Sequence, residues 1–100
     1  MSRIVNGAEE FKELVSKGTV IVDFYADWCG PCRMQGPILE EIEKDMEDVS
    51  IVKVNVDDNP DLADAFQVQS IPMLIIFKDA KIVKKFVGLT PKAKIVAEIK

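Results

Sequence analysis

The chain has 100 residues, 48% of them hydrophobic, with a formal net charge of −4 at pH 7. This length suits one domain, residues 1–100, which buries roughly 65% of its unfolded surface without needing a metal or a staple. No apolar run approaches the ~18 residues that span a membrane, and the N-terminus lacks the apolar stretch of a signal peptide. We therefore expect an intracellular, cytoplasmic protein. The acidic balance argues against nucleic acid or a membrane as a partner, and we expect a monomer.

The first half of the chain alternates helical and strand patterns. Asn6 and Glu9 have the spacing of a capping box, which predicts a short helix that ends at Gly18. Residues 19–26 are almost continuously apolar and β-branched, as in a strand buried on both faces. A second helix is predicted after the cysteines, and residues 50–56 alternate as a strand. The apolar residues at helical spacing are Phe11, Leu14, Val15, Met34, Ile38, Leu39, Ile42 and Met46.

The second half predicts a helix, a hairpin and a last helix. Asn59-Pro60 and Thr90-Pro91 both suit the cap and first position of a helix. Residues 73–77 and 81–87 are predicted strands joined by a short turn. The apolar residues expected on the two helices are Leu62, Phe66, Ile95, Val96 and Ile99. This order of elements predicts an α/β fold with a mixed sheet covered by helices on both faces.

The chemistry of the chain centres on two cysteines, Cys29 and Cys32, in a sequence without histidine. They fall where a strand ends and a helix begins, so the positive end of the helix dipole favours a thiolate at Cys29. A bond between them needs a first helical turn that can tighten, which Gly30 and Pro31 supply. A purely structural disulfide that closes so short a loop would stabilise the fold by only about 2 kcal/mol. A zinc site would have only two of the four ligands that it needs. Redox chemistry is therefore favoured over both alternatives.

The stretch W-C-G-P-C at 28–32, within V-D-F-Y-A-D-W-C-G-P-C-R, resembles the active-site stretch of the thioredoxin family. The likeness continues through P-I-L-E-E-I (37–42), K-V-N-V-D (53–57) and S-I-P (70–72), in matching order over nearly the whole chain. The resemblance implies the thioredoxin fold, a mixed five-stranded central sheet flanked by four helices. It implies a protein disulfide reductase with a redox-active Cys29–Cys32 disulfide and no other cofactor or metal. The implied partners are disulfide-containing client proteins and a thioredoxin reductase.

The resemblance also implies roles for individual residues. Cys29 would be the exposed nucleophile that attacks a client disulfide, and Cys32 would be the shielded residue that resolves the mixed disulfide. Asp23 would be buried, with a raised pKa, and would exchange protons with Cys32, while Lys53 would be its charge partner. The alternatives are a strand-end carboxylate in water and an ordinary surface lysine. Substrate binding would involve Trp28, Gly30, Pro31, Ile71, Pro72 and Gly88, with a cis bond before Pro72 and an extended client segment added as a strand at Ile71.

Three positions depart from the family pattern. Tyr25 stands where the family often has tryptophan, a change expected to matter little for the chemistry, and Gly36 stands where alanine is usual. Asp79-Ala80 replaces an Asn-Gly or Asp-Gly turn, so a residue with a Cβ is expected at a positive φ. A binding module that keeps the fold, with incidental cysteines, stays open as a second function. The retained cysteines and Asp23 favour the reductase.

Overall fold

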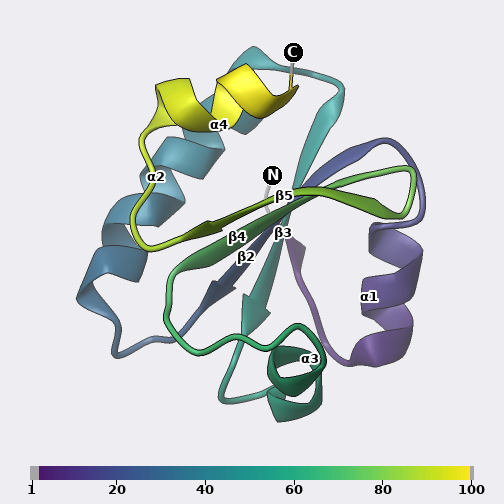
Figure 1. The fold of residues 1–100 in the computed structure, drawn as a ribbon, viewed down its shortest axis with the longest axis vertical. Helices are drawn as coiled ribbons and strands as arrows, with labels where there is room; N and C mark the ends of the chain where they lie inside the picture. The colour runs from purple at the N-terminus through teal and green to yellow at the C-terminus, as the bar shows by residue number, and fades with distance from the viewer. Residues whose placement is uncertain (1–2, 100) are drawn as a thin grey trace.

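The computed structural model describes residues 3–99, which form a five-stranded mixed sheet with helices on both faces. The strand order is β1-β3-β2-β4-β5; β3 is parallel to β1 and β2, and β4 is antiparallel to β2 and β5. Figure 1 shows α1 and α3 on one side of the sheet and α2 and α4 on the other, which confirms the predicted architecture. No helix within residues 3–99 is long and apolar enough to cross a membrane. In chain order the elements are β1 (Arg3–Ile4), α1 (Ala8–Leu14), β2 (Thr19–Tyr25), α2 (Gly30–Asp45), β3 (Val49–Asn55), α3 (Pro60–Ala65), β4 (Met73–Lys78), β5 (Lys81–Val87) and α4 (Lys92–Ile99).

The central strand β2 is buried on both faces, as its near-continuous apolar sequence predicts. Successive side chains of a strand point to opposite faces of the sheet. Val22 and Phe24 therefore pack in the cluster that includes Phe11 of α1, whereas Ile21 packs in the cluster that includes residues of α2 and α4. Asp23 is two residues from Ile21, so its carboxylate lies on the α2 side of the sheet.

The start of α1 differs from the predicted capping box. The helix is capped by Gly7, with φ 94°, and the carboxylate of Glu10 accepts a hydrogen bond from the Asn6 amide at 3.0 Å. Glycine adopts the positive φ at Gly7 without steric cost, so the cap lies one residue later than predicted. The carboxylate that accepts from the Asn6 amide is accordingly that of Glu10 and not that of Glu9. The helix ends at Leu14, earlier than predicted, because the residues that follow make the turn into β2.

The buried face of α2 also differs from the prediction in one place. Gln35, Leu39 and Ile42 are fully buried, at spacings of four and three residues, and so form one stripe along the helix. Met34, predicted on the apolar face, is 61% exposed, because successive helical residues lie about 100° apart around the axis. A polar residue therefore occupies the core position that the sequence pattern assigns to its neighbour.

The last helix starts later than the Thr90-Pro91 pattern predicts. α4 begins at Lys92, and the carbonyl oxygen of Pro91 accepts a hydrogen bond from the Ile95 amide at 3.4 Å. The hydroxyl group of Thr90 donates to the carbonyl oxygen of Gly88 at 3.0 Å, so it stabilises the loop after β5 and does not cap α4. Ile95 is fully buried, as predicted.

The turn between β4 and β5 consists of Asp79 and Ala80, with φ values of 49° and 71°. Both residues have the left-handed backbone conformation that a two-residue turn of type I′ requires. The expectation of a residue with a Cβ at a positive φ is thus confirmed. Asp79 is tied to the start of β2: its amide donates to the Gly18 carbonyl oxygen at 3.0 Å, and its carboxylate accepts from the Gly18 amide at 2.9 Å. Ala80 has no side-chain polar group that could compensate for its strained backbone.

Replacing Ala80 with glycine is expected to raise the free energy of unfolding by about 0.5–1 kcal/mol. Removing the Cβ relieves a left-handed strain of about 1–2 kcal/mol, and the greater freedom of glycine in the unfolded chain offsets part of this gain. Urea denaturation of Ala80→Gly measures the change. Asp79→Gly is the control, because it relieves similar strain but loses the carboxylate bond to Gly18. Equal stabilisation by both substitutions would show that this bond contributes nothing.

Candidate active site

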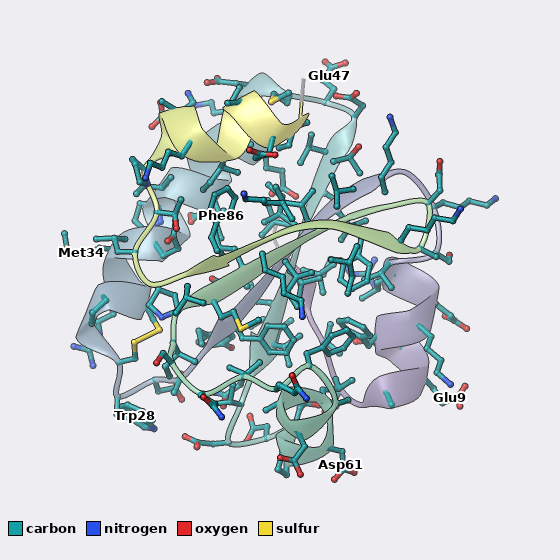
Figure 2. All side chains as sticks on the ribbon, in the orientation of Figure 1. Glu9, Trp28, Met34, Glu47, Asp61 and Phe86 are labelled. Carbon is teal, nitrogen blue, oxygen red and sulfur yellow. A yellow bond between two sulfur atoms is a disulfide. The ribbon has the colours of Figure 1, made fainter. Side chains whose placement is uncertain are left out.

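The two cysteines lie at the edge of the sheet where β2 ends and β4 begins. Since β2 and β4 are antiparallel, the end of β2, the start of α2 and the loop before β4 come together there. Figure 2 shows the disulfide at this edge, near Trp28. The end of β5 reaches the same place, because the Gly88 amide donates a hydrogen bond to the Pro72 carbonyl oxygen at 2.8 Å.

Cys29 and Cys32 form a disulfide across the first turn of α2, with their Cα atoms 5.3 Å apart. Cys29 is the N-cap residue of the helix, and Pro31 lies within its first two positions. The Cys32 amide donates a hydrogen bond to the Cys29 sulfur at 3.2 Å. An amide donor and the positive end of the helix dipole thus both act on the Cys29 sulfur, and both stabilise a thiolate there.

The expectation that Cys29 is exposed and Cys32 shielded is wrong for the disulfide form. The two residues are 4% and 5% exposed, so they are buried to the same degree. Tyr25, Val56 and Ile71 pack around the pair and cover both sulfur atoms. The Cys29 sulfur also lies 3.8 Å from the Ile71 carbonyl oxygen.

The residues expected to bind substrate surround the disulfide. The peptide bond before Pro72 is cis, as the resemblance implies. Trp28 is 68% exposed, and its indole N–H donates to the carboxylate of Asp57 at 2.9 Å, which fixes the ring beside the cysteines. Pro72 itself is buried, and Ile71 and Gly88 are partly exposed. Gly30 and Pro31, between the cysteines, are exposed.

Two further apolar residues at this edge were not predicted. Val87 and Leu89 flank Gly88 and are 68% and 42% exposed. The sequence contains a weak signal for them, because apolar residues on both sides of a glycine at a strand end have no predicted helix or strand to cover them. Together with Trp28, Pro31, Ile71 and Gly88 they form an apolar rim at this end of the sheet.

Asp23 is fully buried, as expected, and neither of its carboxylate oxygens has a hydrogen-bond partner among the described residues. Burial raises the pKa of Asp23 to about 6, and the positive charge of Lys53 partly opposes this increase. The two residues are direct neighbours on the parallel strands β2 and β3. Lys53 therefore acts on the carboxylate through its charge, without donating a hydrogen bond to it.

The side chain of Lys53 reaches past Asp23 toward the cysteines. Its ammonium nitrogen lies 4.5 Å from the centre of the Tyr25 ring, a cation–π distance. A cavity of about 190 Å³ beside it is lined by Tyr25, Ala26, Asp27, Cys32, Arg33 and Lys53. Burial raises the pKa of the Tyr25 phenol. Tyr25 thus lies at the site, and the expectation that this position matters little for the chemistry stays a prediction.

The side chains present at this site can support few kinds of reaction. The chain has no histidine, and residues 3–99 contain no cluster of three or more potential metal ligands among His, Cys, Asp and Glu. The Cys29–Cys32 bond lies within the first turn of α2 and links no two strands of the sheet. Exchange between the reduced Cys29 and Cys32 thiols and an external disulfide transfers two electrons to that disulfide and forms the Cys29–Cys32 bond. Fold and site together define a thiol–disulfide oxidoreductase.

Comparison with known proteins agrees with this class. The model of the thioredoxin family matches residues 2–100, and the chain belongs to this family. Thioredoxin of Chlamydia caviae is 46% identical over 96 residues, which cover 96% of this chain and 93% of the relative. Thioredoxin of Staphylococcus aureus is 49% identical over 84 residues, covering 83% and 81% of the two chains. The solved structure of a mutant thioredoxin from Halobacterium salinarum superimposes with a TM-score of 0.92 at 36% identity, covering 98% and 87%.

The chain is therefore a protein disulfide reductase whose redox-active pair is Cys29 and Cys32. Family membership over this length, with the disulfide formed, favours this activity over the alternative of a binding module with incidental cysteines.

Proposed function

We propose that Cys29 is the nucleophile and Cys32 the resolving residue. The Cys29 thiolate attacks a client disulfide, forms a mixed disulfide and releases the first client sulfur as a thiolate. The Cys32 thiolate then attacks the Cys29 sulfur, so that the second client sulfur leaves and the Cys29–Cys32 bond forms. The observation that carries this assignment is the hydrogen bond from the Cys32 amide to the Cys29 sulfur at the start of α2.

We further propose that Asp23 accepts the proton of the Cys32 thiol during the second attack. A general base works best when its pKa is near the working pH, and burial brings the pKa of Asp23 to about 6. No imidazole competes for this role, because the chain has no histidine. In this proposal the charge of Lys53 adjusts how easily Asp23 releases the proton again.

The client is proposed to bind as an extended segment across the apolar rim. The Ile71 amide has no hydrogen-bond partner within the described residues, and the residue lies directly beside the Cys29 sulfur. An extended client strand could pair with this free backbone, while Trp28, Val87 and Leu89 offer apolar contacts. A rim with few charges suits many protein sequences in place of one charged small molecule.

The partners follow from this chemistry. We propose that client proteins with accessible disulfides oxidise the pair and that a thioredoxin reductase reduces it again. The protein would act in the cytoplasm, where thiols stay reduced. It would work as a monomer, without nucleic acid, membrane or an added cofactor. Residues 1–100 would form a single domain, which is supported by the one sheet built from strands between Arg3 and Val87.

Insulin reduction with dithiothreitol as the electron donor tests the assignment of the two cysteines. Cys29→Ser and Cys32→Ser are both expected to reduce the rate to that of dithiothreitol alone. When the reduced proteins are freed of dithiothreitol before insulin is added, only Cys32→Ser should form a lasting mixed disulfide, visible on a non-reducing gel, since it keeps the nucleophile but cannot resolve. An adduct formed by Cys29→Ser instead would reverse the assignment.

A further inference from the structure

Two residues of β2, Asp23 and Tyr25, lie near the Lys53 ammonium group, and the ammonium group contacts only Tyr25. Asp23 is opposite Lys53 in the parallel pairing of β2 and β3, and Tyr25 lies two residues further along the same face. The ammonium nitrogen lies over the Tyr25 ring, 4.5 Å from its centre. The carboxylate oxygens of Asp23 are left without a hydrogen-bond partner within residues 3–99.

This position also places the ammonium group between two hollows. One is the cavity of about 190 Å³ that includes Cys32 in its lining. The other is a groove of about 490 Å³ between α2 and β3, lined by Lys53 and by Gly36 of α2. A Cβ atom added at Gly36 would lie 3.9 Å from the ammonium nitrogen, an ordinary contact distance, so α2 comes close to the group on this side. On the side of β2, the Lys53 ammonium group packs against the face of the Tyr25 ring.

We infer that Tyr25 is a positioning residue for disulfide exchange, whose ring holds the Lys53 ammonium group off the Asp23 carboxylate, on the side of the cavity that Cys32 also lines. The inference deepens the proposed function, because it rests on the proposed proton transfer between Asp23 and Cys32. A cation held on a ring face gains electrostatic attraction without forming an ion pair. A direct ion pair with Lys53 would favour the charged form of Asp23, whereas the observed arrangement leaves Asp23 able to hold a proton.

Other charged groups face this region and remain in place in the experiment. Asp27 and Arg33 line the small cavity, and Asp58 acts on Tyr25 from the loop after β3. On α2, the groove beside Lys53 is lined by Glu40, Glu43 and Lys44. Since none of these residues is changed, a difference between variants reports on the ring and on Lys53.

The test is the titration of Asp23 in the oxidised protein, followed by NMR of its side-chain carboxyl carbon. Tyr25→Phe keeps a ring and is the matched control, so its Asp23 pKa should stay near the wild-type value of about 6. Tyr25→Leu removes the ring and frees Lys53 to approach the carboxylate, which should lower the pKa of Asp23 by about 1. In a Lys53→Met background the same Tyr25→Leu substitution should not lower it.

Two results would overturn the inference. One is an Asp23 pKa that does not change in Tyr25→Leu. The other is an equal decrease with and without Lys53, which would mean that the ring acts only by excluding water. Cooperative unfolding of each variant in urea shows that the fold is retained. The proposed proton transfer is tested separately: if Asp23→Asn reduces insulin at the wild-type rate, that proposal fails, whereas the titrations still decide whether Tyr25 positions Lys53.

Discussion

Replacing Asp23 with alanine is expected to stabilise the oxidised protein by about 2–3 kcal/mol at pH 8, and this gain should largely disappear below pH 4. The pKa of Asp23 is raised from 3.8 to about 6 by burial. A pKa difference of 1 between the folded and unfolded states corresponds to about 1.4 kcal/mol, so the charged carboxylate carries a penalty of about 3 kcal/mol in the folded protein. The small cavity left by alanine offsets part of this gain.

The sign of the pH dependence follows from proton binding. Between pH 3.8 and about 6 the folded protein keeps a proton on Asp23 that the unfolded chain has already released. Wild-type stability therefore decreases relative to Asp23→Ala as the pH rises through this window, and the difference is constant above it. Urea denaturation of both proteins between pH 3 and pH 8 measures this difference. Asp64→Ala, which removes an exposed carboxylate, is the control for net charge.

The same substitution separates stability from activity. Asp23→Ala should reduce insulin more slowly than the wild type while resisting denaturant better, because a buried base useful for proton transfer is costly to keep charged. A variant that is less stable than the wild type at pH 8, or one that keeps the full rate of insulin reduction, would contradict this account of Asp23.

Gln35→Ala is expected to destabilise the protein by about 3–4 kcal/mol. The Gln35 side chain is fully buried and bonds Thr90 twice: its amide nitrogen donates to the Thr90 carbonyl oxygen at 3.0 Å, and its oxygen accepts from the Thr90 amide at 2.8 Å. Truncation leaves two buried backbone groups without partners and opens a cavity. Both effects destabilise the contact between α2 and the loop before α4.

Two further substitutions separate these effects. Gln35→Met keeps most of the side-chain volume but loses both hydrogen bonds, so it should cost about 2–3 kcal/mol. Gln69→Ala, at an exposed position, should change the free energy of unfolding by less than about 0.5 kcal/mol. Urea denaturation at pH 7 measures all three variants. A Gln35→Met protein as stable as the wild type would show that filling the space is what matters and that the hydrogen bonds do not.

The sequence is most informative where periodicity and residue chemistry point the same way. The apolar run of β2 predicts a strand buried on both faces, and Asp23 within it predicts a buried carboxylate. The cysteine pair at a strand-to-helix boundary predicts the redox site. These features depend on neighbours along the chain, which one sequence records directly.

The features that sequence reasoning misses depend on contacts between distant segments. Gln35 is polar, and its partner Thr90 is 55 residues away, so nothing nearby marks it as a core residue. The contact of Tyr25 with Lys53 depends on the register of β2 and β3, and the equal burial of Cys29 depends on the packing of Ile71 against the disulfide. The start of α1 depends on the φ of Gly7, which the sequence allows but does not specify.

Trp28 is the only tryptophan of the chain, and it stands exposed at the rim of the redox site with its indole N–H bonded to Asp57. Indole emission from this protein therefore comes from a single fluorophore at the place where clients are proposed to bind. We expect the emission to change when the neighbouring disulfide is reduced and when a docked protein shields the ring from water. Reduction and client binding can thus be followed in the unlabelled native chain, without introducing a probe.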